Sequence, residues 1–149
     1  MFKNILFVCV GNICRSPVAE YWVREQLEKA NFMECQVFSA GIQAVQTAPI
    51  APEMQMILNQ FNIDASKHAA KQIDKNDVAR AEIIFTMETW QKEELSFAFP
   101  SSRGKIFTLG KWCNEEIIDP YRKEQAVFES VFESIKDNWG IWQNKLWNG

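Results

Sequence analysis

The chain has 149 residues, and its 16 lysines and arginines against 19 aspartates and glutamates give a net charge of −3. With 47% apolar and 23% charged residues it has the composition of an ordinary folded protein, which excludes an intrinsically disordered chain. The negative balance provides no overall basic field, so no nucleic-acid partner is expected. The length fits one compact domain over residues 1–149.

Neither the apolar stretches nor the cysteines indicate a membrane protein or a secreted one. No apolar run reaches the roughly 18 residues that span a bilayer, and the apolar start of the chain is interrupted by Gly11 and Arg15 without a cleavage site. The four cysteines, at positions 9, 14, 35 and 113, match neither a disulfide framework nor a zinc pattern. We therefore expect a reduced, cytoplasmic protein that is not embedded in a membrane.

Strands and helices are expected to alternate along the chain. Nearly continuous apolar or β-prone runs predict strands over residues 4–9, 36–39, 82–87 and 105–109. Apolar residues at helical spacing predict helices over 17–30, 52–61, 88–96 and 127–146, the last with Gly140 as its weak point. This order predicts an α/β fold: a four-stranded parallel sheet with helices on both faces and a ligand site at the carboxyl ends of the strands.

The loop from Cys9 to Ser16 joins the first strand to the first helix and has the features of a phosphate-binding loop. Ser16 is expected as the helix N-cap, with Pro17 at the first helical position. Successive backbone N–H groups in such a loop form a nest for anions, and the helix N-terminus adds positive potential. Gly11 permits the tight turn, and Arg15 can hold a tetrahedral oxyanion through two parallel hydrogen bonds.

Cys9 lies at the base of this positive loop, which favours its thiolate form, and a thiolate beneath a bound phosphate is a nucleophile towards phosphorus. The alternative is a buried strand-end thiol beside a solvated arginine. The glycine, Asn12, the hydroxyl after the arginine and the strand–helix flanks favour the functional interpretation. A Walker A loop is excluded because no Gly-Lys-Ser/Thr follows. The expected phosphate-binding residues are Val10, Gly11, Asn12, Ile13, Cys14, Arg15 and Ser16.

Five motifs are similar to those of the low-molecular-weight protein tyrosine phosphatases: VCVGNICRSP at 8–17, Ser-Ala-Gly at 39–41, HAAKQI at 68–73, IIFTME at 83–88 and Asp-Pro-Tyr-Arg at 119–122. The chain most resembles the bacterial branch that works opposite autophosphorylating tyrosine kinases of capsule and exopolysaccharide export. The resemblance implies a single phosphatase domain, a phosphocysteine intermediate and no cofactor. The implied partner is a phosphotyrosine-containing protein, namely a bacterial tyrosine kinase, and a monomer is expected.

Asp119 is the expected general acid. Phosphoryl transfer from tyrosine needs a proton donor for the departing phenolate. Asp119 follows the fourth strand in a loop opened by Gly110, at the same sheet edge as Cys9. An Asp-Pro pair is otherwise a common turn, but the resemblance makes Asp119 the acid and then the base for water. Glu115 and Glu116 are weaker candidates, expected as a solvated run. One protonated carboxyl and one ionised thiol predict a bell-shaped pH profile with a mildly acidic optimum.

Four positions match the residues that hold the loop in shape within the family: Asn12, Ser16, Ser39 and His68. The resemblance implies that Ser16 donates a hydrogen bond to the Cys9 thiolate. It also implies that Ser39 and His68 hold Asn12, whose residue type tolerates left-handed geometry. The chain's single histidine is therefore expected as a support rather than as an acid.

Val45 and Tyr121 are the expected pocket rim. Val45 stands where eukaryotic members of the family carry a bulky aromatic residue, and Tyr121 either walls the pocket or anchors its loop. Ile13 occupies a position at which related protein-arginine phosphatases have threonine, which favours phosphotyrosine. The resemblance also gives Cys14 a redox role, the trapping of an oxidised Cys9 as a disulfide, against the alternative of a small packed residue.

Other functions on the same fold remain as alternatives. One alternative is a protein-arginine phosphatase. Another is an arsenate reductase, which would need two further neighbouring cysteines, whereas Cys35 and Cys113 are isolated and are expected to be buried thiols. A non-catalytic phosphotyrosine-binding module would retain Arg15 and lose Cys9 or Asp119, yet all three are present. A redox sensor would use the two loop cysteines without phosphatase turnover. No carboxylate–histidine cluster suggests a metal site, so neither a metal nor another cofactor is expected.

Overall fold

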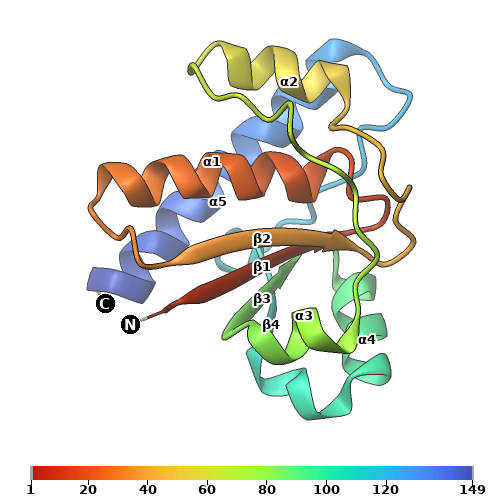
Figure 1. Cartoon of the computed structure of the whole chain (residues 1–149), viewed down its shortest axis with the longest axis vertical. Helices are drawn as coiled ribbons and strands as arrows, with labels where there is room; N and C mark the ends of the chain where they lie inside the picture. The colour runs from red at the N-terminus through yellow and green to blue at the C-terminus, as the bar shows by residue number, and fades with distance from the viewer. Residues whose placement is uncertain (1, 149) are drawn as a thin grey trace.

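A parallel sheet lies at the centre of the structure, a computed structural model that describes residues 2–148 (Figure 1). Its four strands lie in the order β2-β1-β3-β4, with bounds Gln36–Gly41, Asn4–Cys9, Ile83–Thr86 and Ile106–Thr108. The central strands β1 and β3 are almost entirely buried, which explains their apolar runs. The register pairs Cys9 with Gly41 and Val8 with Thr86, so the carboxyl ends of β1, β2 and β3 meet at one edge.

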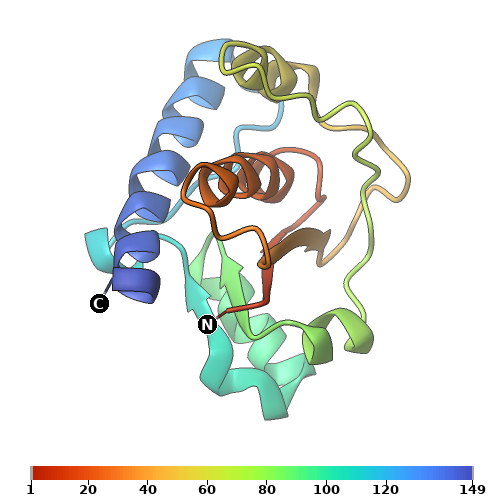
Figure 2. The same ribbon diagram turned by 60° about the vertical axis from the view of Figure 1, so that its left-hand side comes forward.

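Helices cover both faces of the sheet (Figure 1, Figure 2). The core of one face includes residues of α1 (Arg15–Lys29), α2 (Pro52–Asn59) and α5 (Gln125–Asn148). The core of the other face includes residues of α3 (Lys75–Arg80) and α4 (Thr89–Ala98). Short 3₁₀ helices, η1 (Pro100–Lys105) and η2 (Lys111–Cys113), flank β4. Among residues 2–148, no helix is long and apolar enough to cross a membrane.

The fold expected from the sequence is confirmed, and each expected strand and helix lies within two residues of its predicted bounds. The helix α3 was not predicted, because six mostly polar residues show no helical period; a capping box of Asp74 and Asp77 starts it. The helix α5 continues through Gly140, where an added Cβ would meet nothing within 4 Å, so this glycine lies on the open side of the helix.

The start of α1 differs from the prediction. The helix begins at Arg15, with Cys14 at the N-cap position and no side-chain cap, so the expected N-cap role of Ser16 was wrong. The Ser16 hydroxyl is instead bonded to Cys9 and Asn12. Pro17 falls at the third helical position, where a backbone N–H would still have no partner within the helix. The hydroxyl therefore serves the loop rather than the helix end.

Candidate active site

The loop between β1 and α1 turns its carbonyl groups away from its concave side. Four of these carbonyls accept hydrogen bonds of 2.8–3.0 Å from backbone N–H groups of residues 42–51, namely those of Cys9, Val10, Gly11 and Ile13. In a trans peptide unit the C=O and the N–H point in opposite directions, so the N–H groups that follow these carbonyls face the concave side. The loop therefore presents backbone donors to an anion there.

Asn12 holds the loop from behind. It is fully buried and its backbone has a φ of 59°, in the left-handed region that asparagine adopts more readily than most residues. Its carbonyl oxygen accepts from Nε2 of His68 at 2.7 Å, and its side-chain oxygen accepts from the Lys71 N–H at 2.9 Å. Its Nδ2 donates to the hydroxyls of Ser16 and Ser39 at 2.8 and 3.0 Å. These bonds fix both the backbone and the amide of Asn12.

The close approach of β2 to the loop requires Gly41. A Cβ on this residue would lie 2.5 Å from the carbonyl oxygen of Val10 and 3.1 Å from atoms of Asn12. A side chain at position 41 would therefore displace the loop.

Cys9 lies at the end of β1 with only 3% of its surface exposed. Its Sγ is 2.9 Å from the Ser16 hydroxyl oxygen, and the backbone N–H of Ser16 donates to the same sulfur at 3.4 Å. The sulfur thus faces the first turn of α1, whose positive end favours a negative charge.

Arg15 is charged yet only 2% exposed. Its Nη1 donates to Oε2 of Glu88 at 2.7 Å and to the carbonyl oxygen of Ile117 at 2.8 Å. These two bonds use both hydrogens of Nη1 and leave the Nε and Nη2 donors for a ligand. The guanidinium is therefore held at one nitrogen, with a pair of donors available for a phosphate.

A pocket of about 220 Å³ opens over this loop. It is lined by Cys9, Val10, Gly11, Ile13, Cys14, Arg15, Gln43, Val45, Asp119 and Tyr121. The side chains of Asn12 and Ser16 lie behind the pocket, both without solvent exposure, so a phosphate would meet only their backbone. The structure thus brings the predicted nucleophile, arginine and acid to one cavity.

The mouth of the pocket is exposed, in contrast to its floor. Asp119 lies on the surface, and its Oδ1 accepts the backbone N–H of Tyr121 at 3.0 Å. Tyr121 and Val45 are 50% and 53% exposed. Both are therefore placed where they can contact the part of a substrate outside the phosphate.

The two glutamates before Asp119 are bonded away from the pocket. Glu115 contacts Ser134 and lies 3.3 Å from Nδ2 of Asn138, while Glu116 accepts the N–H and hydroxyl of Thr89 at 2.8 and 3.0 Å. Glu116 is exposed, as the prediction of a solvated run implies, whereas Glu115 is partly buried against α5. Both carboxylates tie this loop to neighbouring helices.

The remaining cysteines differ in their surroundings. Burial raises the pKa of Cys14 to about 12, and the neighbouring charges of Cys9 and Asp119 add to this effect. Burial also raises the pKa of Cys35, to about 11, although this residue is only partly buried. Cys113 is exposed on η2, so the expectation of a buried thiol was wrong there.

Several residues of the site were not predicted. Gln43 lines the pocket, Glu88 holds the loop arginine, and Glu20 accepts a bond from Ser39 at 2.6 Å. For Glu88 and Glu20, the position in the sequence could have indicated a place near the site. Glu88 follows β3, the neighbour of β1 at the same sheet edge. Glu20 comes four residues after Ser16, on the same face of α1.

A thiol beneath a ring of backbone donors, with an arginine beside it and a carboxyl at the mouth, is the arrangement of a cysteine-dependent phosphatase. Residues 4–148 match the family model described as low molecular weight phosphotyrosine protein phosphatase. The chain belongs to this family, as its motifs predicted, and is an enzyme of the protein-tyrosine-phosphatase class.

Individual relatives cover nearly the whole chain. A probable low molecular weight protein-tyrosine-phosphatase, EpsP of Ralstonia nicotianae, is 38% identical over 146 residues, which are 98% of this chain and 97% of that protein. With Wzb and AmsI among the other relatives, the predicted similarity to the branch associated with capsule and exopolysaccharide is confirmed.

Solved structures include both tyrosine and arginine phosphatases. Vibrio vulnificus Wzb in complex with benzylphosphonate aligns with a TM-score of 0.89 and 29% identity over 97% of this chain and 99% of that one. The YwlE arginine phosphatase from Geobacillus stearothermophilus aligns with a TM-score of 0.86 and 28% identity over 97% and 92%. Because the fold is common to both activities, the choice of substrate depends on the pocket.

Proposed function

We propose that this phosphatase transfers the phosphoryl group of phosphotyrosine to Cys9 and then to water, with residues 1–149 acting as one phosphatase domain. The observation that supports this mechanism most directly is that Cys9, Arg15 and Asp119 line the same pocket.

In the first step the phosphate lies against the backbone N–H groups of the loop and the free Nε and Nη2 donors of Arg15. The Cys9 thiolate attacks phosphorus opposite the tyrosine oxygen, so the S–P bond forms as the P–O bond breaks. Asp119 gives its proton to the departing oxygen, which leaves as a neutral phenol. The backbone donors and Arg15 stabilise the charge on the transferring group.

In the second step water attacks the phosphocysteine. The Asp119 carboxylate, now ionised, takes a proton from this water, and the S–P bond breaks as phosphate forms. The sulfur leaves as a thiolate, stabilised by the Ser16 hydroxyl 2.9 Å away. Asp119 and Cys9 thereby return to their starting protonation states. The chain's own groups supply the positive charge and the proton transfers of both steps.

The walls of the pocket favour an aromatic substrate. Ile13, Val45 and the ring of Tyr121 offer apolar surface to a phenyl ring. The guanidinium of phosphoarginine would lose hydration against the same walls. The Wzb structure in complex with benzylphosphonate, a ligand with a benzyl group, supports this preference. The YwlE match makes phosphoarginine the second candidate substrate.

For the substrate protein we propose an autophosphorylated bacterial tyrosine kinase of polysaccharide export, in the cytoplasm. The branch to which EpsP, Wzb and AmsI belong supports this choice. Arsenate reduction is disfavoured, because Cys35 precedes β2 and Cys113 lies on η2, outside the pocket.

The test compares two phosphopeptides that differ only in phosphotyrosine or phosphoarginine, each hydrolysed in the presence of EDTA. We expect the wild-type protein to prefer phosphotyrosine, EDTA to leave the rate unchanged, and Cys9→Ser to abolish the activity. Faster release of phosphate from the phosphoarginine peptide would assign the second candidate instead.

A further inference from the structure

Hydrogen bonds between side chains lead from the candidate nucleophile to the surface of α1. This chain of hydrogen bonds connects, in order, Cys9, Ser16, Asn12, Ser39, Glu20 and Arg24. Its distances are 2.9, 2.8, 3.0 and 2.6 Å from the sulfur to Oε1 of Glu20. Glu20 and Arg24 complete the chain as an ion pair one helical turn apart.

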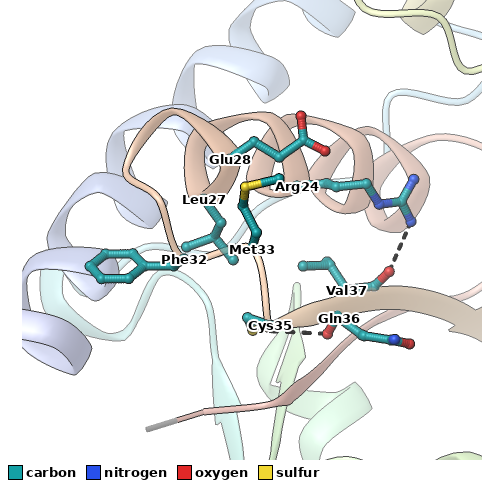
Figure 3. Close-up of a pocket in the computed structure, with 8 residues that line it drawn as sticks. All are labelled: Arg24, Leu27, Glu28, Phe32, Met33, Cys35, Gln36 and Val37. Atoms are coloured by element: carbon teal, nitrogen blue, oxygen red, sulfur yellow. Dashed lines mark hydrogen bonds between the residues drawn. The ribbon is translucent and has the colours of Figure 1, made fainter.

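Arg24 marks the outer end of this chain. It lies beside a second pocket between α1 and β2, where Figure 3 shows its guanidinium reaching the carbonyl oxygen of Val37. Its Nη2 donates to that oxygen at 2.9 Å and to the Glu20 carboxylate. Glu20 itself is 9% exposed, so this permanently charged arginine supplies the counter-charge of a nearly buried carboxylate.

Donor and acceptor can be assigned for each hydrogen bond, starting from the carboxylate end. An ionised carboxylate only accepts, so the Ser39 hydroxyl donates to Glu20 and keeps its oxygen free to accept. The amide nitrogen of Asn12 only donates, and it gives one hydrogen to Ser39 and one to Ser16. The hydroxyl hydrogen of Ser16 is then left for the sulfur of Cys9.

A reversed hydrogen bond at Ser39 would change the hydrogen bond that Cys9 receives. If the Ser39 hydroxyl donated its hydrogen to Asn12 instead of Glu20, the Asn12 amide would be more stable after a flip that places its oxygen, an acceptor, towards Ser39. That oxygen would then accept the hydrogen that Ser16 otherwise gives to Cys9. The Lys71 N–H opposes this flip from the other side, since it already donates to the amide oxygen at 2.9 Å.

We infer that Glu20 and Arg24 are positioning residues of the phosphatase: their ion pair sets the direction of the hydrogen-bond chain, so that Ser16 donates to the Cys9 thiolate. The inference rests on the proposed function and adds to it two residues that line no part of the phosphate pocket.

The other titratable or charged groups near these hydrogen bonds are unchanged in the test variants. Cys14, Arg15 and Asp119 share the pocket with Cys9. On the α1 side, Tyr21 lies close enough to Glu20 to be influenced by its charge. At the middle of the chain, Nε2 of His68 is bonded to the carbonyl of Asn12.

The experiment measures the alkylation of Cys9 by iodoacetamide against pH in Glu20→Gln, located by peptide mass spectrometry. The amide has the shape of the carboxylate but carries a donor, so it permits the reversed direction at Ser39. We expect the rate near pH 6 to fall about tenfold, the effect of one lost bond to a charged group, and to recover as the pH rises. The value of kcat/KM for p-nitrophenyl phosphate falls with it.

Two variants of Arg24 and one control complete the design. Arg24→Gln, at a side chain that is 40% exposed, removes the guanidinium that holds Oε2 of Glu20, so the carboxylate is free to turn away from Ser39. This variant shows a shift in the same direction even if Glu20→Gln does not fold. Arg24→Lys restores the charge and most of the alkylation rate. Glu25→Gln breaks a more exposed pair with the same (i, i+4) spacing on α1, to Lys29 at 3.9 Å, and behaves as the wild type.

The outcomes separate this inference from the proposed function. Unchanged alkylation of Cys9 in both Glu20→Gln and Arg24→Gln overturns the inference while the activity stands. An equal loss at every pH, with a lower urea midpoint, also overturns it, because that result describes a purely structural role. A wild-type Cys9 that reacts like an ordinary thiol contradicts the proposed function itself.

Discussion

The two loops that form the pocket differ in burial and in the number of hydrogen bonds that hold them. In the loop of residues 9–16, Asn12, Arg15 and Ser16 are at most 2% exposed, and their side chains make several buried hydrogen bonds. In the loop that carries the proposed acid, Asp119 and Tyr121 are exposed and share one local bond. The proposed nucleophile therefore lies in a preformed site, whereas the proposed acid lies where it can exchange protons with water.

One contact joins the two loops. The carbonyl of Ile117, two residues before Asp119, accepts from Nη1 of Arg15 at 2.8 Å, and the Ile117 N–H donates to the carbonyl of Met87 at 3.0 Å. The acid loop is thus tied to the buried site just before it reaches the surface. Changes in the buried loop should affect every substrate, and changes in the exposed loop should depend on the leaving group.

The largest effect is expected at the floor of the pocket. Cys9→Ser replaces the nucleophile and should lower kcat for p-nitrophenyl phosphate by more than about a thousandfold. Phosphate should still raise the melting temperature of this variant, because the backbone donors and Arg15 remain. Retention of activity within tenfold of the wild type would show that the sulfur is not the nucleophile.

The exposed loop should show a dependence on the leaving group. Asp119→Asn cannot give a proton and should lower kcat by about 10²–10⁴, with a larger loss for phenyl phosphate than for p-nitrophenyl phosphate, whose leaving group needs less help. The general acid works only when protonated, so the fall in rate at higher pH should disappear in this variant. A wild-type profile that is flat from about pH 5 to about pH 8 would contradict the two-group scheme.

The contact that orients Arg15 should have an intermediate effect. Glu88→Gln keeps the shape but loses the charge that holds Nη1, and we expect kcat/KM to fall about tenfold with aryl phosphates. Glu116→Gln is the matched control, since Glu116 ties the Asp119 loop to Thr89, the residue after Glu88, at the start of α4. Equal losses in the two variants would mean that Glu88 acts through loop stability alone.

The smallest effect concerns Cys14, the second thiol of the pocket. Its pKa is raised to about 12, so it stays a neutral thiol at every pH below about 11, and only alkaline conditions ionise it. Iodoacetamide near pH 7 should therefore label Cys9 and leave Cys14 unmodified in the native protein, as peptide mass spectrometry reports. After unfolding in urea both should react. Labelling of native Cys14 as fast as Cys9 would contradict this difference.

The parts of the molecule that depend on local pattern were predictable. The apolar run of β1 identified a strand with both faces buried, and the spacing from Cys9 to Arg15 identified the loop that lines the pocket. Both features depend on residues that are neighbours in the sequence. The position of Asp119 at the same edge followed from the parallel order of the strands.

The supports of the site depend on contacts between distant segments, which no local pattern contains. Glu88 meets Arg15 across 73 positions, and Ser39 meets Glu20 across 19. The N-cap assigned to Ser16 failed for the same reason: the residue type suits a cap, but its hydroxyl is bonded to Asn12 and lies against Cys9. Tertiary hydrogen bonds decided its role.

The most direct test of the account is to trap the covalent intermediate. Because p-nitrophenolate is a good leaving group, we expect the first step with p-nitrophenyl phosphate to be faster than the second, so a rapid acid quench should capture enzyme that carries phosphate. The account predicts a burst of p-nitrophenol and phosphate on Cys9, located by mass spectrometry and missing from Cys9→Ser. Turnover without any phosphoenzyme, or phosphate on another residue, would contradict it.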